Sequence, residues 1–213
     1  MISKEGPINR REIEAKLASV GDYVKMDYLQ SCLKRSLDFD NKKYVLLTLA
    51  HIYETRKMFL EAGRMMRNAA EINSTYDAKI NDYLKAMDLF IKGGGFDDAD
   101  ISFTKALGCA EGMQKERIKR TRKEAYLKQA DGYLAGDKRK HAMEAYQRYL
   151  TFPEVTGDER KSAQQALLGI YEKLGKITEY GNLKRSMTQP AQPNKEAREQ
   201  SRTSSFSWRD IGL

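Results

Sequence analysis

The residues that could do chemistry are few and lie far apart. The two histidines, His51 and His141, and the two cysteines, Cys32 and Cys109, are separated by long stretches of chain. No CxxC or HExxH sequence occurs, whereas a structural zinc site needs four closely placed ligands. The glycine run 93–95 lacks the Lys-Ser/Thr of a phosphate-binding loop, so a turn between helices explains it better. We therefore expect no catalytic residue, no cofactor and no metal, and we predict that the protein is not an enzyme.

A run of positive side chains is the strongest charge feature. It lies within a chain of formal net charge +8, and its only opposite charges are Glu116 within it and Glu124 directly after it. One interpretation is a solvated helix face, and the other is contact with phosphates or an acidic partner. The second makes an RNA- or ribosome-associated protein the alternative function. We call this run the basic patch; it consists of Lys115, Arg117, Lys119, Arg120, Arg122 and Lys123.

The composition narrows the class of protein. Of 213 residues, 40% are apolar and 32% are charged, above the usual charged share of about 25%. No stretch approaches the roughly 18 uncharged apolar residues of a membrane span. The start, MISKEGPINRRE, has no apolar run and so no visible secretory signal. We therefore expect a soluble, cytoplasmic protein with no membrane span.

The spacing of prolines and apolar residues predicts helices throughout. Proline interrupts a helix at about 3 kcal/mol, and the chain from Pro7 to Pro153 has no other proline. No alternating run typical of a strand occurs. Short loops between the expected helices predict antiparallel neighbours. Apolar spacing near 3.6 gives ten helices, at about 9–19, 22–37, 41–56, 59–72, 76–93, 97–109, 113–134, 138–152, 158–174 and 177–187, with Asp40-Asn41 and Asp137 among the expected N-caps.

Small and large apolar residues then recur at a fixed pattern. The clearest unit carries Leu46, Leu49, Ala50 and Tyr53 on its first helix, and Ala62, Met66 and Ala69 on its second. Small residues let two helices approach closely, and large ones fill the space beside them. This stretch resembles the tetratricopeptide-repeat family. The resemblance implies an all-α fold, an antiparallel helix-pair solenoid with irregular repeats.

Later units repeat the pattern more loosely. The anchor alanines Ala62, Ala99 and Ala142 are 37 and 43 residues apart, longer than the roughly 34 of an ideal repeat. In the last unit Tyr180 stands where a small residue is expected. We predict a helical pair or cap at 1–41, a repeat domain at 42–187, and a linker with a docking motif at 188–213.

The resemblance implies that the first helix of each pair lines a concave groove that binds a peptide or helix of another protein. Chaperone-binding members use a two-carboxylate clamp of Lys, Asn and Arg. Here Tyr44, Thr48 and His51 occupy the positions where that clamp would begin, so capture of a chaperone's acidic end is not expected. The expected groove residues are Tyr44, Leu47, His51, Asn81, Lys85, Asp88, Lys128 and Asp131.

The character of the chain changes after Met187. A polar linker, TQPAQPNKEAREQSRTSS, leads to a short apolar motif. The motif could dock on another protein, fold back on the chain's own groove, or have no role. Its last seven residues, SWRDIGL, are similar to the W-x-D-I-G-G-L segment that precedes the ATPase module of AAA-family proteins, lacking one glycine, which implies such an ATPase as a partner. The tail motif comprises Phe206, Trp208, Arg209, Asp210, Ile211 and Leu213.

Overall fold

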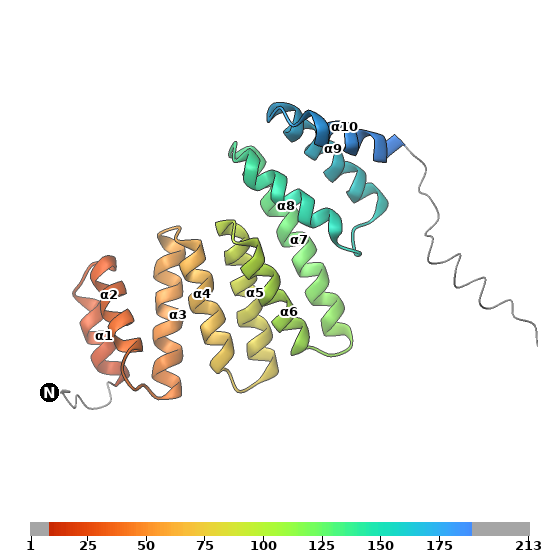
Figure 1. The fold of residues 1–213 in the computed structure, drawn as a ribbon. Helices are drawn as coiled ribbons and strands as arrows, with labels where there is room; N and C mark the ends of the chain where they lie inside the picture. The colour runs from red at the N-terminus through yellow and green to blue at the C-terminus, as the bar shows by residue number, and fades with distance from the viewer. Residues whose placement is uncertain (1–8, 189–213) are drawn as a thin grey trace, which may run out of the picture. The chain divides into compact units, whose positions relative to one another are not determined.

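The structure, a computed structural model, describes residues 9–188 and is helical throughout that range (Figure 1). The all-α prediction is confirmed, because the described chain contains helices and no strand. In chain order the helices are α1 (Arg10–Ala18), α2 (Asp22–Leu33), α3 (Phe39–Thr55), α4 (Phe59–Ile72), α5 (Tyr76–Gly93), α6 (Phe96–Gly108), α7 (Met113–Ala135), α8 (Arg139–Thr151), α9 (Gly157–Lys173) and α10 (Ile177–Thr188).

The chain divides into two compact units. Within residues 9–188, the first unit runs to residue 160 and holds α1 to α8, and the second begins at residue 161 and holds most of α9 and all of α10. This division follows compactness alone. The functional boundaries expected at residues 41 and 187 stay predictions.

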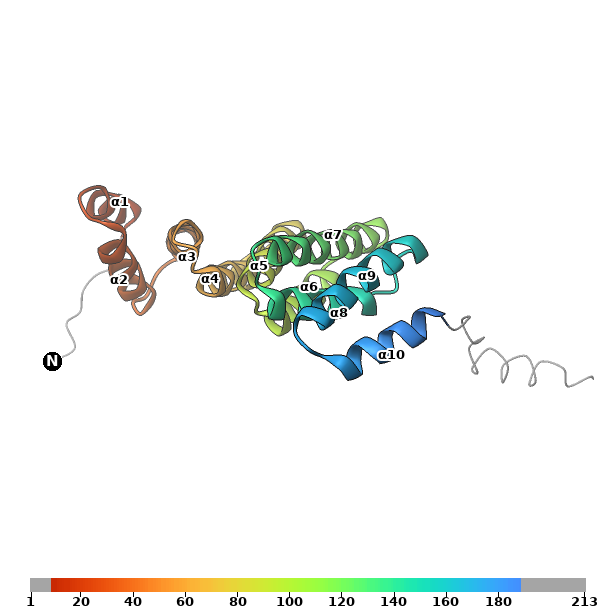
Figure 2. The same cartoon turned by 90° about the horizontal axis from the view of Figure 1, so that it is seen from above.

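Within the first unit, successive helices pair and form two layers. Helix α4 packs against both α3 and α5, α5 packs against α6, and α7 packs against α8. Seen from above, α3, α5 and α7 form one layer, and α4, α6 and α8 form the other (Figure 2). The predicted antiparallel helix pairs are therefore present, with a first helix of each pair in one layer and a second helix in the other.

Small residues set how closely these helices approach. The three anchor alanines Ala62, Ala99 and Ala142 are all fully buried. Gly63, beside the first of them, is packed so tightly that an added Cβ would lie 2.9 Å from the ring of Phe90 on α5. The large residues of the pattern, among them Tyr53 and Tyr126, are buried beside the alanines. The repeating small and large positions thus form the core of the first unit.

Three of the expected helix ends that differ from the structure have a clear physical cause. Helix α3 begins earlier, because the Asp38 side chain, and not Asp40-Asn41, accepts a hydrogen bond from the Asn41 backbone amide at 2.7 Å. Asp137 does not cap α8, since its φ of 55° places it in the left-handed region and Lys138 is the N-cap. Helix α2 stops at Leu33 because the next amides bond to carbonyls three residues back, which tightens and ends the last turn.

Candidate functional site

A row of partly exposed leucines marks the layer of first helices. Leu47, Leu84 and Leu127 lie on α3, α5 and α7, each 15 residues before its anchor alanine. Figure 2 shows α3, α5 and α7 in one layer, and the shared offset gives the three leucines equivalent places in the repeat pattern. We call the surface of α3, α5 and α7 that carries these three leucines and the expected groove residues the first-helix face. Leu84 and Leu127 were missed by the sequence reasoning, although the equal offset could have identified them.

Ion pairs join the first helices across this face. Lys85 Nζ on α5 lies 2.7 Å from Glu54 Oε1 on α3, and Lys92 Nζ lies 4.0 Å from the same oxygen. Lys92 also pairs with Asp88 at 2.8 Å. The predicted groove residues Lys85 and Asp88 are therefore brought together in one charge network with Glu54, which sequence reasoning did not include.

The N-terminal end of the face is hollowed. Tyr44 and Leu47 line a pocket of about 660 Å³ together with Arg10 of α1 and the acidic residues Asp38 and Asp40. The Arg10 guanidinium lies 4.4 Å from the centre of the Tyr44 ring, a cation–π contact. Tyr44 is thus partly covered by α1, and this pocket reaches only two of the eight expected groove residues.

The other expected groove residues lie on α3, α5 and α7 with their side chains toward solvent. His51, Asn81 and Lys128 are exposed. Asp131 is exposed too, and it accepts a hydrogen bond from the Tyr146 hydroxyl of α8. Burial raises the pKa of Tyr146, and the Asp131 carboxylate raises it further, so this hydroxyl stays a donor at neutral pH. At Asp131 the first-helix face is therefore hydrogen-bonded to α8 of the second layer.

The basic patch on α7 separates into buried and exposed cations. The Arg122 guanidinium lies between two rings, 3.8 Å from the centre of Phe103 and 3.8 Å from that of Phe152. Its side chain is 13% exposed and lies 3.6 Å from Glu154. Burial lowers the pKa of Arg122, opposed by Glu154, and the group remains charged. Arg122 is therefore a packing residue of the first unit and not a surface cation.

Carboxylates pair with several other members of the patch. Lys123 Nζ lies 2.8 Å from Glu159 Oε1 and donates to the Glu154 carbonyl at 3.4 Å. Lys119 lies 2.8 Å from Glu116 on the same helix. Arg120 is 70% exposed and reaches Glu124 only at 3.9 Å. Among the six cations, Lys115 and Arg117 are exposed and have no ion-pair partner within residues 9–188.

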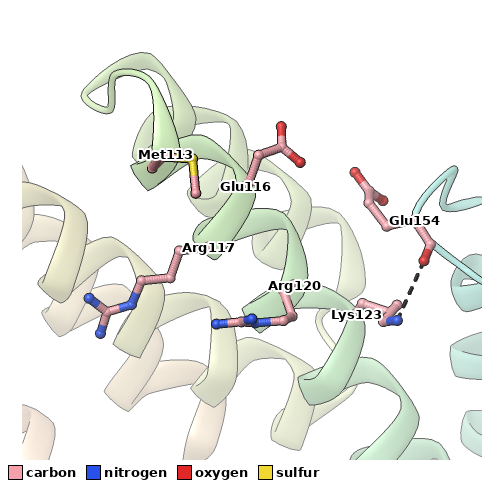
Figure 3. Close-up of a pocket in the computed structure, with 6 residues that line it drawn as sticks. All are labelled: Met113, Glu116, Arg117, Arg120, Lys123 and Glu154. Carbon is pink, nitrogen blue, oxygen red and sulfur yellow. Dashed lines mark hydrogen bonds between the residues drawn. The ribbon is translucent and has the colours of Figure 1, made fainter.

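The exposed end of the patch borders a pocket of about 340 Å³ (Figure 3). Arg117 and Arg120 extend to one side of α7, whereas Lys123 points toward Glu154 on the other. Met113 and Glu116 complete the lining. The pocket therefore presents two available guanidinium groups, with carboxylates close by.

A metal-binding cluster and a membrane-spanning helix are both absent from the described residues. No group of three or more His, Cys, Asp or Glu side chains in residues 9–188 is placed to hold a metal ion. No helix there is long and apolar enough to cross a bilayer. The tail motif, from Phe206 to Leu213, lies outside the described residues.

Comparison with known proteins yields a structural likeness alone. No family model matches the chain, and no curated protein sequence matches it. Among solved structures, the chain is similar to the crystal structure of BtubC (BKLC) from P. vanneervenii, at 14% sequence identity and a TM-score of 0.35. That alignment covers 86% of this chain and 81% of the other.

Proposed function

We propose that the protein is a non-enzymatic binding module of the tetratricopeptide-like kind, which holds a peptide or helix of another protein on the first-helix face. The observation that carries the proposal is the repeated, partly exposed leucine at Leu47, Leu84 and Leu127. Four residues after each leucine stands a polar, ionisable side chain, on successive helices His51, Asp88 and Asp131. Leucines that served only to pack the core would be buried, as Leu46 and Leu49 beside Leu47 are.

The leucines and the charged side chains would contribute to binding in different ways. Apolar area removed from water contributes roughly 25 cal/mol per Å², so a row of leucines supplies affinity. The charged neighbours select a register and a partner, since charge complementarity contributes more to specificity than to affinity. An amphipathic helix with apolar anchors three and four residues apart suits such a surface.

Affinity purification from the native cell with a matched pair of variants tests this proposal. Leu84→Gln with Leu127→Gln removes apolar area from the face while keeping side chains of similar length. Ile101→Gln is the control, because Ile101 is an exposed apolar residue on α6 in the other layer. We expect the double variant to lose partners that the control retains, with helical content unchanged by circular dichroism. Identical partner lists for both would refute the proposal.

A second candidate is binding of RNA or ribosomes through the basic patch. The exposed, unpaired Lys115 and Arg117 beside Arg120 favour it. Four carboxylates oppose it, because Glu116, Glu154 and Glu159 lie against the other cations of the patch and Glu124 lies 3.9 Å from Arg120 itself. Binding through two or three cations would weaken with salt, but only with the shallow slope that so few phosphate contacts give. The double variant Arg117→Glu with Arg120→Glu tests this candidate, and unchanged RNA retention would dismiss it. We favour the first candidate.

Recruitment of a second protein through the tail, including an AAA-family ATPase, stays a prediction. It has a direct test in the same purification. Removal of residues 188–213 would lose a tail-dependent partner, and unchanged partner lists would dismiss this role.

A further inference from the structure

Helix α10 carries an apolar stripe that the described residues 9–188 cover only in part, since Tyr180 and Leu183 are half-buried and Ile177 and Met187 are exposed. Ile177, Tyr180, Leu183 and Met187 recur at spacings of three, three and four, which places them on one side of the helix. None of the twelve residues of α10 is buried, and Ile177 is 82% exposed. By contrast, α9 buries Ala163, Leu167, Ile170 and Tyr171. A contiguous exposed apolar surface commonly marks an interaction site, so we expect a cover for this stripe.

The stripe begins in a pocket. At the turn from α9 to α10, a hollow of about 230 Å³ is lined by both helices, including Tyr171, Ile177 and Tyr180. The turn is made by Gly175, whose φ of 67° suits glycine. A pocket with aromatic walls and one polar side is a usual seat for a tryptophan or phenylalanine anchor.

We propose that the tail motif of the same chain, residues 206–213, is the cover of the α10 stripe. The motif supplies four apolar side chains, Phe206, Trp208, Ile211 and Leu213, against the four of the stripe. It also carries Asp210, which is opposite in charge to Lys184 and Arg185 of α10. Lys184 Nζ lies 5.6 Å from the centre of the Tyr180 ring, so a cation stands beside the stripe.

The length of chain between helix and motif permits this contact. Residues 189–205 connect α10 to the motif, and 17 residues span at most about 55–60 Å. Helix α10, with 12 residues, is about 18 Å long. The motif can therefore reach every part of the stripe. A tether of this length also gives an effective concentration near the millimolar range, which a second copy or a separate protein does not reach at ordinary concentrations.

The single tryptophan of the sequence makes the proposal directly measurable. Because Trp208 is the only tryptophan, the intrinsic fluorescence of the full chain reports its surroundings alone. We expect a blue-shifted emission and a several-fold smaller quenching constant with acrylamide than for a peptide of residues 189–213. Ile177→Asp should restore the peptide-like emission and quenching. Ile177 is too exposed for this change to affect folding, and circular dichroism checks that it does not.

Two controls test whether the tail motif of the same chain, and not a second copy, covers the α10 stripe. Ile101→Asp alters an exposed apolar residue of α6 and should leave the tryptophan signal unchanged. Dilution over a hundredfold range should leave it unchanged too, because the contact is within one chain. Peptide-like emission in the unaltered chain, or a buried tryptophan insensitive to Ile177→Asp, would overturn the proposal. A signal that changes on dilution would assign the stripe to a second copy and overturn it as well.

Discussion

At the scale of residues, side chains of one type have separate roles in this protein. Arg117 and Arg122 lie five residues apart on α7, yet the first is exposed and the second lies between two aromatic rings. The sequence predicted the cluster of cations but not which of them are buried and which are exposed. The partners of Arg122 are Phe103, from another helix, and Phe152, from the segment after α8, and only the folded chain brings them together.

A pair of substitutions measures this difference. Arg122→Ala removes two cation–π contacts and leaves the half-buried Glu154 without its partner, so we expect a loss of about 2 kcal/mol in the free energy of unfolding. Arg117→Ala changes an exposed, unpaired side chain and should stay within about 0.5 kcal/mol. Urea unfolding of both variants checks the prediction. Equal losses would mean that α7 does not use Arg122 for packing.

Glu159 gives the chain a specific response to acid. Hydrogen bonds from Lys123 and from the Thr156 backbone amide lower the pKa of Glu159 from its ordinary value near 4.5 to about 2. A carboxylate with a lowered pKa stabilises the fold above pH 4.5, and this contribution disappears as the pH falls toward 2. Glu159→Gln should therefore be less stable than the unaltered chain at pH 7 and nearly equal to it near pH 2. Urea midpoints measured across this range test the convergence.

Glu124 provides the control for the acid response. It is 67% exposed and lies 3.9 Å from Arg120, the loosest pair in the patch. Surface pairs of this kind contribute little to stability. Glu124→Gln should follow the unaltered chain at every pH, and a convergence like that of Glu159→Gln would contradict the assigned role of Glu159.

At the scale of elements, the sequence predicted all the helices that the structure describes. The long proline-free interval and the 3.6-residue apolar spacing were sufficient for α1 to α9, because each of these helices buries apolar side chains at that spacing. The predictions were wrong at some of the helix ends. Asp38 and Asp40 are both competent caps, and the choice between them depends on the extended backbone at Asp38, which the sequence does not reveal.

Two glycines within helices should respond in opposite ways to the same change. Alanine is favoured over glycine in a helix by up to about 1 kcal/mol. At Gly132 on α7 an added Cβ would meet only the end of the Gln129 side chain, at 4.0 Å, which is an ordinary contact, so Gly132→Ala should stabilise the chain. At Gly63 on α4 a Cβ would lie 2.9 Å from the Phe90 ring, and overpacking of this kind costs about 1–3 kcal/mol, so Gly63→Ala should destabilise it. Thermal unfolding gives both signs, and a stabilising Gly63→Ala would refute the close approach of α4 and α5.

At the scale of the whole molecule, the candidate site was predictable only in part. Fixed offsets from the anchor alanines place Leu47 and the expected groove residues on successive first helices. The charge network of Lys85 with Glu54 joins residues 31 apart, and no local pattern encodes that pairing. The sequence thus indicated which side chains share the first-helix face, whereas the contacts among them depend on how the helices pack.

Hydrogen exchange should show a graded stability along the chain. Helix α5 buries seven side chains and packs against α4, α6 and α7, so its amides should exchange slowest. Helix α10 buries none of its own residues 177–188, so its protection depends on whatever covers its stripe. If the tail motif is that cover, Trp208→Ala should accelerate exchange in α10 several-fold and leave α5 unchanged. Mass spectrometry of peptides from both helices distinguishes this from a general destabilisation, which would accelerate both, and α10 exchange that is unaffected by Trp208→Ala would separate the tail from the helix.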